Sequence, residues 1–204
     1  SLPSGKEYAL MININEYAKD HMLLVAKGEE PQVLDETKIK DLLFTAKALG
    51  SDYQGFYNSL FAAASRWHFH GQFMQRKSPV WKNIEKGKIK IVNPQVFDGV
   101  TVGELSDNWP ARTRIIQGKD LNKVAKVAWG EINDLITKNI PHNTDFLYTK
   151  DGTYNWLISP RIDDFSTYKG YFLEPESKPA PELFSRFGGN ELPGGDVNML
   201  FNKP

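Results

Sequence analysis

Apolar residues recur every three or four positions along the first third of the chain, which is the spacing of one face of an α-helix. The pattern predicts three helices, over residues 8–27, over residues 35–50, and from residue 51 to a point between residues 66 and 76. Asp35 is placed to cap the second helix, and Gly28 and Gly50 stand where the first two would end. We therefore expect a helical region up to about residue 78.

Beyond residue 78 the periodicity changes. Polar and apolar residues alternate over 88–92, and β-branched residues return over 99–102, so both segments predict short strands. The longest helical stripe runs over 120–138, with Asp120 as the N-cap. After it come three predicted strands, over residues 145–149, 154–159 and 168–173. The first two flank Lys150-Asp151-Gly152, a strong hairpin signal.

Helices come first in this order, strands come later, and strand–helix alternation does not repeat. The order predicts an α+β fold, in which an N-terminal helical region precedes a mainly antiparallel sheet with one long central helix. Residues 1–174 are interpreted as a single α+β domain. Residues 175–204 are rich in proline and glycine and predict an irregular C-terminal segment.

The composition excludes several kinds of site. The 204 residues include no cysteine, which rules out disulfides, thiolate zinc sites and cysteine nucleophiles. The longest apolar runs are about five residues, far below the roughly 20 that span a bilayer, so no membrane span is predicted. The first residues lack the features of a signal peptide. We interpret the chain as soluble and as a processed or excised part of a secreted or translocated protein.

The net charge is zero, but the charge is unevenly distributed. Residues 76–127 carry 11 basic and 5 acidic side chains, a surplus of six positive charges, whereas the segments on both sides are acidic. This basic belt is suited to a phosphate-bearing ligand or another anion. The alternative is a solvated face that pairs with the acidic flanks.

Two of the four histidines stand together in Trp67-His68-Phe69-His70. In an extended segment, His68 and His70 lie on one face and are placed to act as acid–base partners or metal ligands. In a helix their rings diverge, and the helical periodicity before them favours this second geometry. The string WHFHGQFMQ resembles the tryptophan–histidine–histidine variety of HNH-type nuclease toxins, which implies a general base and a metal ligand.

A second group of candidates precedes the predicted helix at Asp120. Arg112, Arg114 and Gln117 are placed near its free backbone N–H groups, which suits an anion cradle. Trp109 lies just before them and is suited to stack on a base. The alternative role of the arginines is in structural salt bridges.

A third group comprises Ser166-Thr167 and Glu174-Pro175-Glu176. Together with Arg114, it resembles the arginine, serine–threonine and glutamate–x–glutamate series of ADP-ribosyltransferases, in which the last glutamate stabilises an oxocarbenium-like centre. Glu176 with Lys178 and either Asp163 or Asp164 also resembles the D…ExK motif of metal-dependent nucleases. The first resemblance implies a catalytic glutamate pair, Glu174 and Glu176, and the second implies a catalytic Glu176.

These features favour an enzymatic effector or toxin-like domain that acts on a phosphate-bearing substrate, either nucleic acid or an NAD-type dinucleotide. Such an enzyme would be a hydrolase or a transferase, and the sequence specifies neither a cofactor nor a metal. The alternative is a non-catalytic module that binds a protein or a carbohydrate, for which five Trp, eight Tyr and twelve Phe are suitable. The two hypotheses differ in whether His68, His70, Arg112 and Arg114 share one pocket.

Overall fold

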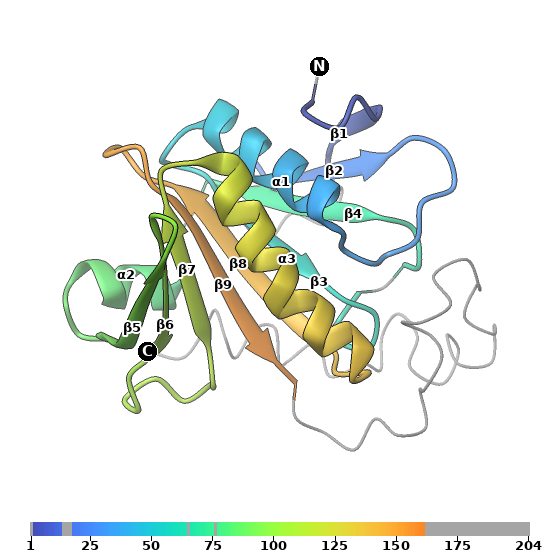
Figure 1. The fold of residues 1–204 in the computed structure, drawn as a ribbon. Helices are drawn as coiled ribbons and strands as arrows, with labels where there is room; N and C mark the ends of the chain where they lie inside the picture. Colours follow the sequence, from blue (N-terminus) through green and yellow to red (C-terminus); the bar gives the residue numbers. More distant parts are fainter. Residues whose placement is uncertain (1, 14–17, 65, 76, 162–204) are drawn as a thin grey trace.

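A computed structural model describes residues 2–13, 18–64, 66–75 and 77–161. This part of the chain forms one nine-stranded antiparallel sheet and three helices (Figure 1). The strands are β1 (Tyr8–Ile12), β2 (Met22–Ala26), β3 (Gln54–Asn58), β4 (His70–Met74), β5 (Ile91–Phe97), β6 (Val100–Leu105), β7 (Arg114–Gly118), β8 (His142–Tyr148) and β9 (Tyr154–Pro160). The helices are α1 (Glu36–Leu49), α2 (Pro79–Glu85) and α3 (Leu121–Thr137). The order across the sheet is β1-β2-β4-β3-β8-β9-β7-β6-β5.

The predicted N-terminal helical region is wrong. The first predicted helix is the β1–β2 hairpin, and the third is β3, a loop and β4, so that α1 is the only helix among the described residues before residue 78. Short apolar runs such as Met22–Ala26 have no periodicity that separates strand from helix. Here β2 lies between β1 and β4, and this pairing decides its conformation.

The second half of the chain matches its predictions more closely. The helix capped by Asp120 is confirmed as α3, and its Asp120 side chain accepts hydrogen bonds from the Asn122 and Lys123 backbone N–H groups. The predicted hairpin is confirmed as β8 and β9. The short strands near 88–92 and 99–102 correspond to β5 and β6, whereas α2 and β7 were not predicted. The predicted strand 168–173 and the segment 175–204 lie outside the described residues.

The two halves of the sheet follow the same path. In the first half, the β1–β2 hairpin leads through α1 to the β3–β4 hairpin, and β4 pairs with β2. In the second half, the β6–β7 hairpin leads through α3 to the β8–β9 hairpin, and β9 pairs with β7. The halves join where β3 pairs with β8. The described chain is therefore pseudo-symmetric about the β3–β8 pair, and β5 is an extra strand of the second half.

The sheet is covered on both faces, but by different elements. α1 and α3 lie side by side on one face, here called the helix face, and the main core lies between them and the sheet (Figure 1). Phe146 and Trp156 belong to this core, whereas the next residues along their strands, Leu147 and Leu157, pack with Trp81 of α2. Because side chains alternate along a strand, α2 covers the opposite face. In the described residues, no helix is long and apolar enough to cross a membrane.

An aromatic stack marks the centre of the main core. The Phe146 and Trp156 rings on β8 and β9 are 4.7 Å apart and nearly parallel. Phe146 also lies directly over Gly55 of β3, and a Cβ at position 55 would overlap its ring. The glycine is therefore required for close packing at the junction of the two halves.

Replacing Gly55 with alanine should therefore destabilise the protein. We expect Gly55→Ala to lower the free energy of unfolding by about 1–3 kcal/mol, as other overpacked core substitutions do. The matched control is Gly130→Ala in α3, where an added Cβ meets no atom within 4 Å. It should raise stability by up to about 1 kcal/mol, because alanine favours helix over glycine. Urea denaturation of both variants checks this, and equal effects would contradict the close packing at Gly55.

Candidate functional site

His68 and His70 lie in an extended segment, contrary to the helical geometry that the periodicity favoured. His68 pairs with Pro31 in an isolated bridge, and His70 begins β4. The His68 Nε2–H donates to the Ala26 carbonyl at 2.7 Å, and the His70 Nδ1–H donates to the His68 carbonyl at 2.9 Å. Burial lowers the pKa of His70, so its neutral form is favoured. One nitrogen of each ring is thus bonded to the backbone.

Arg114 lies on the helix face of β7 and is held by two carboxylates. Its guanidinium donates to Glu131 of α3 at 2.7 Å and to Glu104 of β6 at 3.3 Å. Burial of the guanidinium by itself would lower the pKa of Arg114. The hydrogen bonds and negative charges of Glu131 and Glu104 outweigh this effect, so the pKa is raised. This geometry corresponds to the structural salt bridge that was the alternative for the arginines. It ties α3 to the sheet.

The other predicted anion ligands lie in different surroundings. Arg112 is exposed in the loop before β7, and Gln117 lies on the opposite face from Arg114, where its amide donates to Asn155 Oδ1 at 2.6 Å. Trp109 is half-buried and packs against the core under α2. These side chains do not surround a common space.

The sheet also separates the histidines from the arginines. Three strands lie between β4 and β7, so four strand spacings, about 19 Å in total, separate His70 from Arg114. The two side chains also point to opposite faces. Glu174 and Glu176 lie outside the described residues. No cluster of three or more potential metal ligands occurs within the described ranges. The enzymatic hypothesis remains a prediction.

Two ionisable groups with shifted pKa values, the half-buried Asp145 and the buried His142, lie on the central strand β8, and neither was predicted from the sequence. Burial raises the pKa of Asp145 to about 7, although Gln54 Nε2 donates a hydrogen bond to its carboxylate. The same Gln54 accepts a hydrogen bond from the Ser78 N–H at 2.6 Å, at the N-cap of α2. Gln54 therefore links the sheet to α2, which gives the pair a structural role.

His142 is the second of these groups, with 1% of its surface exposed. Its Nδ1–H donates to the Ile140 carbonyl at 3.2 Å, and Nε2 has no hydrogen-bond partner among the described residues. Burial lowers the pKa of His142 to about 4. The ring is therefore neutral at physiological pH and packs near Tyr57.

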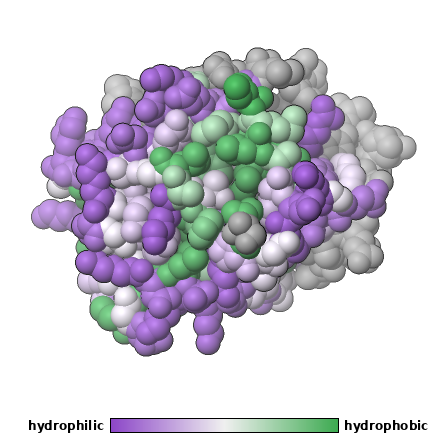
Figure 2. All heavy atoms as spheres, turned by 90° about the horizontal axis from the view of Figure 1, so that it is seen from above, coloured by the Kyte–Doolittle hydropathy of each residue, from purple (hydrophilic) through white to green (hydrophobic). Residues whose placement is uncertain are grey.

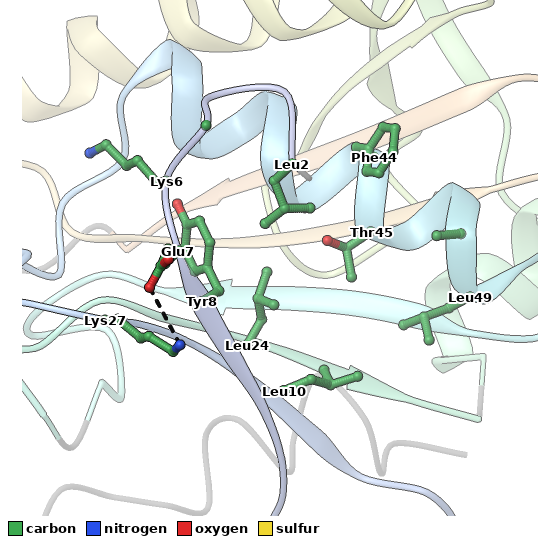
Figure 3. A pocket seen from close by; sticks show the side chains of 12 residues that line it. Leu2, Lys6, Glu7, Tyr8, Leu10, Leu24, Lys27, Phe44, Thr45 and Leu49 are labelled. Carbon is green, nitrogen blue, oxygen red and sulfur yellow. Dashed lines mark hydrogen bonds and ion pairs between the residues drawn. The ribbon is translucent and has the colours of Figure 1, made fainter.

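A groove of about 630 Å³ lies between α1 and the strands β1 and β2. Its apolar lining comprises Leu2, Leu10, Leu24, Phe44, Ala48 and Leu49. Figure 3 shows Leu10 and Leu24 of the strands facing Thr45 and Leu49 of α1. Seen from above, apolar residues form a continuous area bordered by hydrophilic side chains (Figure 2).

The apolar surface extends beyond the groove to the outer strand. Leu10 and Ile12, which lie on the helix face of β1, are 52% and 72% exposed. Phe44 on α1 is 38% exposed. Contiguous apolar surface of this kind is typical of an interaction site, whereas isolated exposed apolar residues are common everywhere.

The charged side chains at the rim of the groove and the Thr45 hydroxyl inside it have polar partners. At the rim, Lys27 Nζ lies 3.4 Å from the Glu7 carboxylate (Figure 3). Lys6 Nζ lies 2.6 Å from the Glu30 carboxylate. Inside, the Thr45 hydroxyl donates to the Asp41 carbonyl at 2.8 Å. A ligand with many polar groups would have to compete with these pairs, whereas an apolar ligand would leave them intact.

The buried histidine should make stability depend on pH. Because the pKa of His142 is about 4 in the folded protein and about 6.5 when unfolded, the unfolded state takes up a proton first as the pH falls. The His142 contribution is complete above about pH 6.5, and about 3 kcal/mol of it is lost by pH 4. In His142→Asn, which retains a donor near Nδ1, this part of the pH dependence should disappear. Urea denaturation of both proteins between pH 4 and pH 7 measures it, and parallel curves would contradict the assignment.

No family model matches this chain, and no curated protein matches it. Its function is therefore inferred from its own geometry. Among the described residues, the groove and the adjacent edge strand combine a hollow with exposed apolar side chains, which suits a ligand.

Proposed function

We propose that the protein is a binding module that holds an apolar segment of another polypeptide in the groove between α1 and the β1–β2 hairpin. The observation that carries the proposal is the partly exposed apolar lining of this groove in the described structure, where Leu10 of β1 is 52% exposed and Phe44 of α1 is 38% exposed. Burying such surface is the main favourable term in most protein association. The role corresponds to the interaction module that the sequence left as the alternative.

The pseudo-symmetry of the sheet supports the proposal. α3 packs on β7, β9 and β6, the strands of its own half. α1 instead packs mainly on β8 and β3, toward the middle of the sheet. The helix face of β1, the counterpart of β6, is therefore more exposed: Leu10 and Ile12 are 52% and 72% exposed, whereas Leu24 and Ala26 of β2 and the core residues of β6 are buried. The groove is the space that this shift of α1 leaves.

The chemistry of the lining favours a polypeptide over a carbohydrate or a phosphate compound. The interior is mainly aliphatic, and the charged side chains at the rim are already in ion pairs. A groove beside a helix, open along its length, suits an amphipathic helix whose apolar stripe faces inward. In that arrangement the bound helix would lie beside α1 on the helix face of β1 and β2.

A displayed library of random peptides tests the proposal, and the selection requires no candidate partner. Enriched peptides should carry apolar residues at three- and four-residue spacing and should bind Phe44→Glu about tenfold or more weakly, because a buried aromatic contact is replaced by a charge. The matched control is Phe97→Glu at the far edge of the sheet, where Phe97 is 54% exposed and binding should be unchanged.

Two outcomes would overturn the proposal. One is a selection without enrichment, and the other is a set of enriched peptides that bind Phe44→Glu as tightly as the unaltered protein. Thermal melting of both variants serves as the control for folding, and since both phenylalanines are exposed we expect little change in the melting temperature.

A further inference from the structure

The edge strand β1 presents backbone groups that have no partner strand within the described part of the chain, and these groups follow a regular pattern. Next to the strand, the Lys27 N–H donates to the Glu7 carbonyl at 2.9 Å, and the Asn13 N–H donates to the His21 carbonyl at 2.8 Å. Hydrogen-bonded positions alternate in an antiparallel pair, so odd-numbered residues of β1 bond to β2. The N–H and C=O groups of Tyr8, Leu10 and Ile12 therefore point away from the sheet, toward the open edge.

The two edges of the sheet are built differently. β5 contains Pro94, has an irregular register with β6 between Val92 and Gln95, and places Asn93 at a φ of 50°. A proline and an irregularity of this kind protect an edge against pairing with another chain. β1 contains no proline and no charged residue, and its register with β2 is regular. Its edge therefore lacks these protections.

The pseudo-symmetry indicates what would fit beside β1. The counterpart of β1 in the second half is β6, and β6 pairs on its outer side with the antiparallel strand β5. The described chain has no strand at the equivalent position outside β1. An antiparallel strand beside β1 would complete the correspondence between the halves.

We propose that β1 pairs with β1 of a second copy of this chain, antiparallel, about a two-fold axis at Leu10. In this register Leu10 lies opposite Leu10 of the second copy, and Tyr8 lies opposite Ile12 in both directions. All six outward N–H groups and all six outward C=O groups of the two strands are then paired. No charged side chain lies within the paired residues 8–12, so no like charges oppose each other.

A second copy fits this edge for two reasons. The outward backbone groups of residues 8, 10 and 12 match themselves in the antiparallel direction, and the strand has no charged side chain that would repel its own copy. The two-fold axis is perpendicular to the sheet, so both helix faces lie on the same side. The two grooves then lie next to each other across the β1 strands, between the two α1 helices. The contact uses the backbone edge of β1, and in this respect it goes beyond the proposed function of the groove.

The size of the contact sets the expected affinity. A single strand pair of five residues is smaller than a standard interface of roughly 1,200–2,000 Å². We therefore expect a reversible dimer whose population rises with protein concentration. Sedimentation velocity over a wide concentration range measures this equilibrium.

A charge exchange at the axis tests the register. Leu10→Lys places two lysines directly opposite each other, and Leu10→Glu places two glutamates there, so each variant alone should dimerise about tenfold or more weakly than the unaltered protein. An equimolar mixture of the two variants should restore the dimer, because each pair then joins opposite charges. Val96→Lys is the matched control, since Val96 is 68% exposed on the opposite edge strand and should not affect association.

A cysteine scan tests the axis independently, because the chain has no cysteine of its own. Directly opposed residues of a hydrogen-bonded pair have Cα atoms about 5.5 Å apart, which a disulfide can span. Under mild oxidation, Leu10→Cys should form a covalent dimer rapidly. Ile12→Cys should do so much more slowly, because position 12 lies opposite position 8 of the second copy.

The outcomes separate this proposal from that of the groove. A protein that stays monomeric at all concentrations, a lysine–glutamate mixture that does not associate, or equal cross-linking at positions 10 and 12 would each overturn the β1 dimer. Enriched peptides that depend on Phe44 would support groove binding in any of these cases. A dimer with no peptide enrichment would leave the pairing of β1 standing and remove the proposed function.

Discussion

The pairing of β3 with β8 is the contact on which the rest of the described structure depends. It joins two pseudo-symmetric halves into one sheet, and it brings the Phe146 ring onto Gly55 and against Trp156. Without this pair, the first half would be a four-stranded sheet and the second a five-stranded sheet. α1 would then lose β8, the strand on which it mainly packs. The backbone groups of β3 and β8 must pair, so the two halves form one continuous sheet. The helices α1 and α3, one from each half, therefore lie side by side over the junction.

The two faces of this junction differ in chemistry. The helix face is closed by aromatic and aliphatic packing, and Arg114 joins α3 to the strands through Glu131 and Glu104. On the other face, Gln54 connects the half-buried Asp145 with the start of α2. Shifted pKa values occur at functional sites, but they also occur in structural polar networks. Asp145 belongs to a structural polar network, because its partner Gln54 also bonds to the start of α2.

The position of α1 determines where the protein is open. Because α1 lies toward the centre of the sheet, the β1–β2 hairpin keeps an apolar floor that a symmetric arrangement would have covered. The same hairpin carries an edge strand without proline or charge. Apolar surface and unpaired backbone groups thus occur together at one end of the sheet, and both are suited to another polypeptide.

Much of the second half of the fold could be predicted from the sequence, because its signals are local. Asp120 and the apolar stripe after it define α3, and Lys150-Asp151-Gly152 defines the turn between β8 and β9. In the first half, only α1, with its cap at Asp35, had signals of this kind.

The candidate site was less predictable. His68 and His70 were recognised as neighbours, but whether they lie in a helix or a strand depends on pairing with residues distant in sequence. The groove arises from where α1 lies on the sheet, and no local motif encodes that position. The absence of cysteine, the caps of α1 and α3 and the last hairpin were determined by the sequence itself, because each depends on residues close together in the chain. Only the tertiary structure decided that residues 8–12, 22–26, 54–58 and 70–74 are strands, that His70 lies far from Arg114 and that the β1 edge is exposed, because strand pairing and helix placement depend on contacts between distant segments.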